Sequence, residues 1–165
     1  MTRWLVAALS LIALHCSSSD SSPRSDIAVR VSAIAYDETA ETPVMILEEE
    51  GGNRQLPIWI GLSEARSIAA QIGDEHGPRP NAHDLARQMI RDLDLSVERV
   101  VVTELRDNVY YARLVLSDAG RLIEIDARPS DAIAIGLRVE APLFVREEVF
   151  FSSASEDPVD EQVAL

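Results

Sequence analysis

An internal repeat constrains the fold of this 165-residue chain more than any other feature. Two stretches align at an offset of 67 positions (130 minus 63), which places Ser63-Glu64-Ala65 on Ser130-Asp131-Ala132 and Ile58 on Ile125. Each stretch begins with three apolar runs of strand length and ends with a run of Ala, Leu and Ile at helical spacing. The repeat therefore predicts two strand-strand-strand-helix units.

The predicted strands cover residues 27–36, 43–48, 55–60, 97–105, 109–116 and 122–127, and the predicted helices cover 63–72, 82–93 and 131–139. The helix over 82–93 belongs to neither unit and lies between the two halves. Three helices packed on a mostly antiparallel set of strands predict an α+β fold. Because a domain averages about 150 residues, we expect a single domain, over residues 27–150.

The first residues have the pattern of an export signal. Arg3 precedes an apolar run from Trp4 to Leu14, which is too short to cross a bilayer because a spanning helix needs about 20 residues. We interpret residues 1–15 as a signal peptide and the polar stretch 16–26 as a tether. Cys16 resembles the acylated cysteine of bacterial lipoproteins, which predicts a membrane-anchored protein of the cell envelope that faces the periplasm or the exterior. The alternative is an ordinary secretory signal cleaved within 17–19.

The charge balance restricts the partners that the chain can bind. Its 28 acidic and 15 basic residues give a net charge of −13, and every basic residue is an arginine. Nucleic-acid binding depends on neutralising phosphates, so any such role needs a local basic patch. A single cysteine excludes an internal disulfide and a cysteine-rich zinc site. The acidic residues beyond 150 predict a flexible tail over 151–165.

One candidate motif lies at the start of the predicted helix over 82–93. Free backbone amides and the helix dipole favour a phosphate there, and His83 and Asp84 lie beside them, four and five residues after Arg79. His83 would transfer a proton, Arg79 would stabilise charge, and Asp84 would orient the histidine or bind a metal. The structural alternative is that Asn81 and Asp84 form a capping box and His83 is only a first-turn residue.

A second candidate motif joins the strand over 122–127 to the following helix. Asp126 and Asp131 are hard oxygen ligands suited to Mg²⁺ or Mn²⁺, and Arg128 and Ser130 are suited to a phosphate. The structural alternative is that Ser130 caps the helix, Asp131 complements its dipole, and Arg128 pairs with Asp126. Trp59 is a separate candidate: it either stacks on a nucleobase or packs in the core or an interface, and the few aromatic residues favour packing.

Three ordered motifs together resemble the bifunctional nuclease domain family, from about Ile27 to Val149. They are Leu56-Pro57-Ile58-Trp59-Ile60-Gly61 with Glu64-Ala65, then Arg79-Pro80 with His83-Asp84-Leu85, then Asp126-Ala127-Arg128-Pro129-Ser130-Asp131-Ala132-Ile133-Ala134. The resemblance implies an α+β fold and cleavage of both DNA and RNA. The chain departs from the family pattern at Asn81-Ala82, where Leu-Thr is usual, and at Asn108-Val109, where a glycine is commoner.

These observations support two hypotheses. In the first, the protein is an exported nuclease with His83, Asp84, Arg128 and Asp131 as catalytic residues. Arg79, Arg128 and Ser130 then bind the substrate, and Asp126 and Asp131 bind Mg²⁺ or Mn²⁺. In the second, it is a non-catalytic, envelope-tethered module that binds a protein or a small ligand. The partners that the two hypotheses allow are DNA or RNA, a membrane reached through a lipid on Cys16, and a second copy of the chain.

Overall fold

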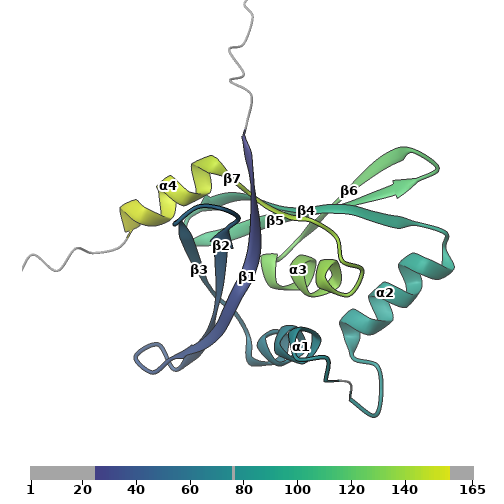
Figure 1. The fold of residues 1–165 in the computed structure, drawn as a ribbon, viewed down its shortest axis with the longest axis horizontal. Helices are drawn as coiled ribbons and strands as arrows, with labels where there is room; N and C mark the ends of the chain where they lie inside the picture. The colour runs from purple at the N-terminus through teal and green to yellow at the C-terminus, as the bar shows by residue number, and fades with distance from the viewer. Residues whose placement is uncertain (1–24, 76, 157–165) are drawn as a thin grey trace, which may run out of the picture.

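The computed structural model describes residues 25–75 and 77–156 (Figure 1). The predicted signal peptide, Cys16 and most of the tether lie outside the described residues. Within the described part, strands and helices run from Asp26 to Glu156. They form a mixed α+β fold, which confirms the fold class expected from the sequence.

The strands of the described residues form one sheet in the order β3-β2-β1-β7-β4-β5-β6. The first antiparallel meander consists of β1 (Asp26–Asp37), β2 (Thr42–Glu49) and β3 (Gln55–Trp59), and the second of β4 (Ser96–Arg106), β5 (Val109–Asp118) and β6 (Arg121–Ala127). The short strand β7 (Leu143–Arg146) joins them, because it pairs antiparallel with β1 and parallel with β4.

Each meander is followed by a helix. The helix α1 (Leu62–Ile72) follows β3, α3 (Pro129–Leu137) follows β6, and α2 (Ala82–Asp92) lies between the two halves in sequence. Helices α1 and α3 begin 67 positions apart, at the offset of the predicted repeat. The six predicted strands and three predicted helices are observed with shifts of a few residues at their ends. The duplication itself stays a prediction.

Two elements are absent from the sequence prediction. Strand β7 has only four residues, which is too short a run for a periodic pattern to register. Helix α4 (Glu147–Glu156) combines acidic residues, serines and a few apolar residues and lacks a clear helical stripe. It includes residues 151–156, which the sequence analysis assigned to the tail, and the rest of the tail lies outside the described residues. The boundary of the tail stays a prediction.

Helix α3 is the centre of the packing that positions the site. It contacts α1, α2, β4 and β5, and Ala132, Ile133 and Ala134 are buried in it. Gly136 lets the helix approach β4 closely, because a Cβ atom at this position would lie 2.8 Å from Val100 Cγ2. Figure 1 shows α1, α2 and α3 together on one side of the sheet and α4 on the other.

Both faces of β4 are therefore covered. Val100, Val101 and Val102 are buried in succession along β4, where α3 and α4 each contact the strand. A continuous apolar run is typical of a strand that packs on both faces. Within residues 25–75 and 77–156, none of the helices is both long enough and apolar enough to pass through a membrane.

Candidate functional site

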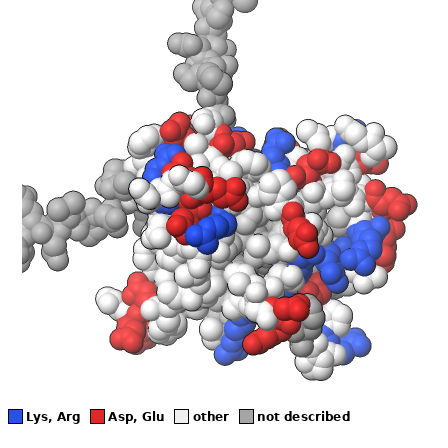
Figure 2. All heavy atoms as spheres, in the orientation of Figure 1, with Lys and Arg blue, Asp and Glu red and all other residues white. Residues whose placement is uncertain are grey.

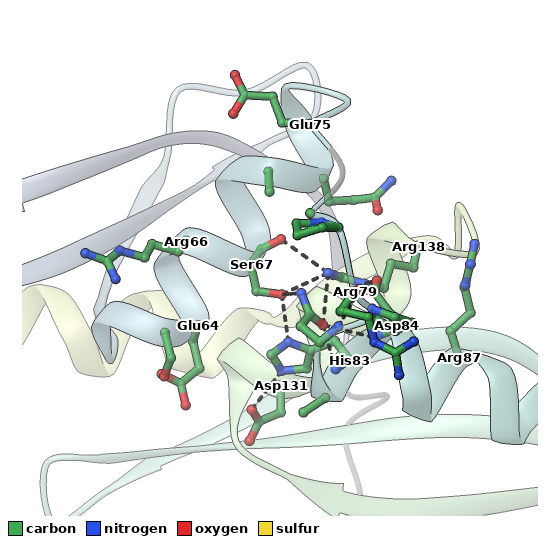
Figure 3. A pocket seen from close by; sticks show the side chains of 18 of the residues that line it. Glu64, Arg66, Ser67, Glu75, Arg79, His83, Asp84, Arg87, Asp131 and Arg138 are labelled. Carbon is green, nitrogen blue, oxygen red and sulfur yellow. Dashed lines mark hydrogen bonds and ion pairs between the residues drawn. The ribbon is translucent and has the colours of Figure 1, made fainter.

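A cavity of about 790 Å³ lies where α1, α2 and α3 meet (Figure 3). It is lined by residues of these helices, by the segment that precedes α2, and by Arg128 and Arg138 at the two ends of α3. Its ionisable lining residues are Glu64, Arg66, Glu75, Arg79, His83, Asp84, Arg87, Arg128, Asp131 and Arg138. Five arginines against four carboxylates give this surface a local excess of positive charge, although the whole chain carries −13.

The first turn of α2 places His83 in the cavity. Asn81 is the N-cap of this helix, and its Oδ1 accepts hydrogen bonds from the backbone nitrogens of His83 (2.9 Å) and Asp84 (3.0 Å). Asp84 Oδ2 accepts from the backbone nitrogen of Asn81 at 2.8 Å, which completes the capping box predicted as the structural alternative. The cap fixes the first turn of α2, from which the side chain of His83 extends into the cavity.

The imidazole of His83 lies between side chains from the two other helices (Figure 3). Its Nδ1 is 2.8 Å from Ser67 Oγ on α1, and its Nε2 is 3.2 Å from Asp131 Oδ1 on α3. The histidine side chain is only 13% exposed, so both contacts are shielded from bulk water. Three residues that are distant in sequence therefore form one hydrogen-bonded row.

The surroundings of Ser67 determine where the ring proton of His83 lies. Ser67 Oγ accepts hydrogen bonds from Asn81 Nδ2 at 3.0 Å and from Arg138 Nη2 at 2.9 Å. These donors occupy both acceptor positions of the hydroxyl, which has one hydrogen of its own to donate. We infer that this hydrogen is donated to His83 Nδ1, so that Nε2 carries the ring proton and donates it to Asp131.

Arg128 connects the N-terminal turns of two helices. Its Nε donates to Asp131 Oδ2 at 2.7 Å and its Nη2 to Asp131 Oδ1 at 3.0 Å, and Nη2 also donates to Glu64 Oε1 at 2.5 Å. Glu64 and Asp131 are the third residues of α1 and α3 and are paired by the predicted repeat. The Arg128 side chain stays 64% exposed, and its Nη1 makes no hydrogen bond within the described part of the chain. This nitrogen is therefore available to an anion.

The charges around Arg128 are held in their ionised forms. Burial by itself would raise the pKa of Asp131, but the hydrogen bonds from Arg128 and His83 outweigh it and hold this pKa below its ordinary value. The pKa of Glu64 is also lowered, by the hydroxyl of Ser63 and then by Arg128. The same hydrogen bonds with Asp131 and Glu64 raise the pKa of Arg128. The group is therefore a fixed guanidinium between two carboxylates.

A second arginine, Arg138, is buried behind the site at the end of α3. Arg138 follows α3, its side chain is 3% exposed, and its Nε donates to Asp84 Oδ1 at 2.6 Å. Burial by itself would raise the pKa of Asp84, but the hydrogen bonds from Arg138 and from the backbone of Asn81, with the nearby positive charges, outweigh it, so the net shift is downward. Arg138 Nη1 also donates to the carbonyl of Ala134 at 2.7 Å. Asp84 and Arg138 thus fix α2 against α3 at the wall of the cavity.

Most of the residues predicted for the site come together in the structure, and two do not. Arg79, His83, Asp84, Arg128 and Asp131 all line the cavity. Asp126 lies on β6, where its Oδ1 accepts a hydrogen bond from Arg113 Nη1 at 3.0 Å, and it does not line the cavity. Ser130 is buried and lines a neighbouring, smaller cavity. The roles of all these residues stay predictions.

The capping role expected for Ser130 was wrong. Helix α3 begins at Pro129 and its N-cap is Arg128, whose backbone is extended. A residue before proline is driven to this conformation by steric contact with the proline ring, and proline is favoured as the first residue of a helix. Helix α1 begins in the same way, after Gly61 and not at Ser63.

The side chains present do not form a divalent-metal site in this arrangement. Within residues 25–75 and 77–156, no group of three or more His, Cys, Asp or Glu residues is placed to hold an ion. Both oxygens of Asp131 already accept hydrogen bonds from Arg128, and Asp126 lies elsewhere. The predicted role of Mg²⁺ or Mn²⁺ stays a prediction, and no chemical step below depends on it.

Some site residues were missed by the sequence analysis. Glu64 and Ser67 are three positions apart on the helix predicted over 63–72. The one sequence signal for Ser67 is that a serine lies on the apolar side of that helix. Arg138 gave no signal, because an arginine at a helix C-terminus is usually solvated. Arg66 and Arg87 line the cavity and, like Arg79, form no ion pair within 4.0 Å in the described part of the chain.

Comparison with known proteins identifies the family of the chain. The bifunctional nuclease domain model matches residues 45–157, and the chain belongs to this family. An uncharacterized protein of Mycobacterium tuberculosis is 43% identical over 121 residues, which cover 73% of this chain and 72% of that protein.

Plant relatives match a smaller share of their own length. Bifunctional nuclease 2 of Oryza sativa subsp. japonica is 30% identical over 119 residues, which cover 70% of this chain and 37% of the relative. Bifunctional nuclease 1 of Oryza sativa subsp. indica is 27% identical over 113 residues, which cover 67% and 34%. The chain therefore spans about a third of the plant proteins that it matches.

Proposed function

We propose that this protein is a nuclease that hydrolyses phosphodiester bonds of DNA and RNA in the cavity between α1, α2 and α3. The observation that carries the proposal is the convergence of His83 with Arg128 and Asp131, which lie more than 40 residues further along the chain, on one arginine-rich cavity. A histidine supplies proton transfer, and arginines stabilise the negative charge that develops on a phosphoryl group. The names of the plant relatives support the same activity.

Each group has a defined role in the proposed reaction. Arg128 holds the phosphate through its available Nη1, and Arg79 at the cavity lining adds a second positive charge. In its charged form, with both ring nitrogens protonated, His83 gives the Nε2 proton to the leaving oxygen as a water oxygen attacks phosphorus and the P–O ester bond breaks. The neutral imidazole then takes up on Nε2 the proton that the attacking water loses, which restores the charged form. Asp131 orients the imidazole and stabilises its charged form.

The test measures cleavage of single-stranded DNA, duplex DNA and RNA by the purified full chain. We expect His83→Gln to lower the rate by about 10²- to 10⁴-fold, the usual contribution of positioned proton transfer. Arg128→Gln should lower it by about 10²- to 10³-fold, as for other charge-stabilising donors. Arg121→Gln is the matched control, because this arginine is 74% exposed and lines neither cavity.

Three outcomes would contradict the proposal or its parts. Equal activity in His83→Gln and the parent protein would indicate a contaminating nuclease. Nucleic-acid binding without cleavage would favour the alternative of a non-catalytic binding module. An EDTA arm, with Mg²⁺ or Mn²⁺ added back, tests the predicted metal, since a metal-independent rate would remove it from the reaction.

We also propose that the protein acts at the cell envelope, on the basis of the apolar run from Trp4 to Leu14 and of Cys16 two residues after it. Mass spectrometry of the full-length product in a bacterial host should show cleavage before Cys16 and an acylated N-terminus. Cys16→Ser should release the protein from the membrane fraction. Retention of Met1 in the mature protein would overturn this part of the proposal.

A further inference from the structure

A second cavity, of about 380 Å³, adjoins the first one and shares Arg128 with it. It lies between the end of β3, the turn that joins β4 to β5, and the first turn of α3. Its character differs from that of the arginine-lined cavity, because Trp59, Val109 and Pro129 line it and Arg128 is its one charged lining residue. A cavity lined by several arginines and a cavity with a single charged lining residue therefore meet at one guanidinium.

Trp59 is held in place at this cavity with its ring partly open to solvent. It is 49% exposed, and its Nε1 donates a hydrogen bond to Asp37 Oδ2 at 2.9 Å. The sequence favoured a packed tryptophan, but half of this side chain lies outside the core. An aromatic ring that is fixed at one edge and open on its surface is suited to stacking, because little conformational freedom is lost when a ligand binds.

Asn108 adds a polar group at the rim. It lies in the turn between β4 and β5 with a φ of 60°, a left-handed conformation that asparagine adopts more readily than most residues. Its side chain makes no hydrogen bond within the part of the chain that the structure describes, so the amide has donors and an acceptor to offer. The second cavity therefore combines a stacking ring with an amide that can meet the edge of a base.

We infer that the second cavity binds an unpaired nucleobase of the nucleic acid whose phosphate is held at Arg128. This inference rests on the proposed function and specifies its substrate. One nucleotide joins a charged phosphate to a flat, largely apolar base, and the two adjoining cavities match these parts. A base inside a duplex is already stacked and paired, so it would have to leave the helix at a cost of a few kcal/mol. Single-stranded DNA or RNA is therefore the preferred substrate.

The test compares two ligands that differ only in their bases. One is a pentamer of thymidylate, and the other is the same pentamer with abasic tetrahydrofuran residues at all positions, so that the charges are equal. Isothermal titration calorimetry with the full chain measures both affinities. Base stacking on a protein aromatic ring is worth about 5- to 150-fold in affinity, so we expect the thymidylate pentamer to bind more tightly by a factor in this range.

Substitution of Trp59 should remove this preference without removing phosphate binding. Trp59→Ala should bind both pentamers with the affinity that the parent protein has for the abasic one, and Trp59→Phe, which keeps a stacking ring, should retain most of the preference. Tyr36→Ala is the matched control, because Tyr36 is a 59% exposed aromatic residue that lines neither cavity. In a cleavage assay, Trp59→Ala should raise KM for single-stranded DNA and leave kcat close to that of the parent protein.

The outcomes separate this inference from the proposed function. Equal binding of the two pentamers by the parent protein, or a full preference in Trp59→Ala, would overturn the base-binding cavity even if the protein cleaves DNA. A preference that Trp59→Ala abolishes, in a protein that cleaves nothing, would support base binding and overturn the nuclease. If Trp59→Ala is unfolded by circular dichroism, Trp59→Leu, which fills the space without an aromatic ring, takes its place. A preference that is lost in Trp59→Leu but retained in Trp59→Phe and Tyr36→Ala supports the inference, and a preference that is retained in Trp59→Leu overturns it.

Discussion

At the scale of single residues, Ser67 has the widest effect on the site. Its hydroxyl contacts Asn81, His83 and Arg138, which come from the N-cap of α2, the first turn of α2 and the end of α3. It sets the ring proton of His83 on Nε2, the nitrogen that faces Asp131. A serine that is 6% exposed thus controls the chemistry of a histidine on another helix.

Replacement of Ser67 by alanine should destabilise the protein. The change removes the acceptor of Asn81 Nδ2 and leaves the buried Arg138 Nη2 with two longer contacts only, at 3.5 Å to the Ser67 carbonyl and at 3.4 Å to Asn81 Oδ1. Poor satisfaction of a buried polar group costs about 1–3 kcal/mol. We expect the free energy of unfolding, measured by urea denaturation, to fall by this amount. The control Ser96→Ala removes an exposed hydroxyl and should change stability by less than about 0.5 kcal/mol. Equal stability of the two variants would contradict the hydrogen-bond assignment at Ser67.

Asp131 makes the stability of the fold dependent on pH in the acidic range. Its pKa is lowered on folding, so its carboxylate contributes in full above its ordinary pKa of 3.8, and the contribution is lost as the pH falls through the lower folded pKa. The difference in unfolding free energy between the parent protein and Asp131→Asn should be constant above about pH 5 and shrink below about pH 4. A difference that stays the same at pH 3 and pH 7 would show that Asp131 is not ion-paired.

The sequence predicted five of the cavity residues, because their types and spacing belong to motifs that are local in the chain. His83 and Asp84 follow a cap, and Arg128 and Asp131 lie on one turn. Asp126 looked equivalent to Asp131, yet strand pairing gives it to Arg113 on β5. Whether Asp126 can face the cavity depends on the side of β6 from which its side chain extends. Strand β6 is too exposed for its apolar pattern to reveal that side.

At the scale of secondary structure, helix α3 combines a buried body with a functional N-terminus. Its small residues allow close packing on β4, and this packing fixes where Arg128 and Asp131 lie relative to α1 and α2. The equivalent position on α1 holds Glu64, so the first turns of both helices supply a carboxylate to the same guanidinium. An element predicted from periodicity therefore also determines the geometry of the site.

Gly136 is the position at which this packing can be tested. A Cβ atom there would lie 2.8 Å from Val100 Cγ2 and 3.3 Å from Leu143 Cδ2, so alanine would force α3 away from the sheet. Overpacking of this kind lowers the free energy of unfolding by about 1–3 kcal/mol. The better helix propensity of alanine offsets at most about 1 kcal/mol of this loss. We expect Gly136→Ala to lower the melting temperature and to weaken the proposed nuclease activity.

Gly77→Ala is the control for this substitution. The nearest atom to a Cβ at Gly77 lies at 3.6 Å, an ordinary contact distance, and the residue lies in the segment before α2. Its melting temperature should stay close to that of the parent protein. Stability of Gly136→Ala equal to that of Gly77→Ala would show that α3 does not approach β4 as closely as described.

At the scale of the whole molecule, charge is distributed unevenly. The chain has a net charge of −13, and Figure 2 shows acidic and basic side chains interspersed on one face, with a group of basic ones over α2. The larger cavity has five arginines, two of which are held in ion pairs with carboxylates of the site. Long nucleic acids are repelled by the rest of the surface within about a Debye length of 10 Å at 0.1 M salt.

This distribution predicts a weak dependence of binding on salt. Contacts to about three phosphates give a slope of roughly −2 for the logarithm of affinity against the logarithm of salt concentration with a single strand. Fluorescence anisotropy with a labelled single-stranded DNA should measure this slope. Arg79→Gln should reduce it by about 0.7 and Arg121→Gln should leave it unchanged. A much steeper slope would mean that the bound strand extends over basic residues outside the cavity.

The sequence alone determined the α+β fold, most of its strands and helices, and the family, because periodicity and motifs report on burial and capping within a few residues of each position. Only the tertiary structure decided that β7 lies between the two meanders, that Ser67 and Arg138 support His83, and that two cavities meet at Arg128. These contacts join residues far apart in the chain, and their geometry follows from helices packing on a twisted sheet, which no local pattern encodes.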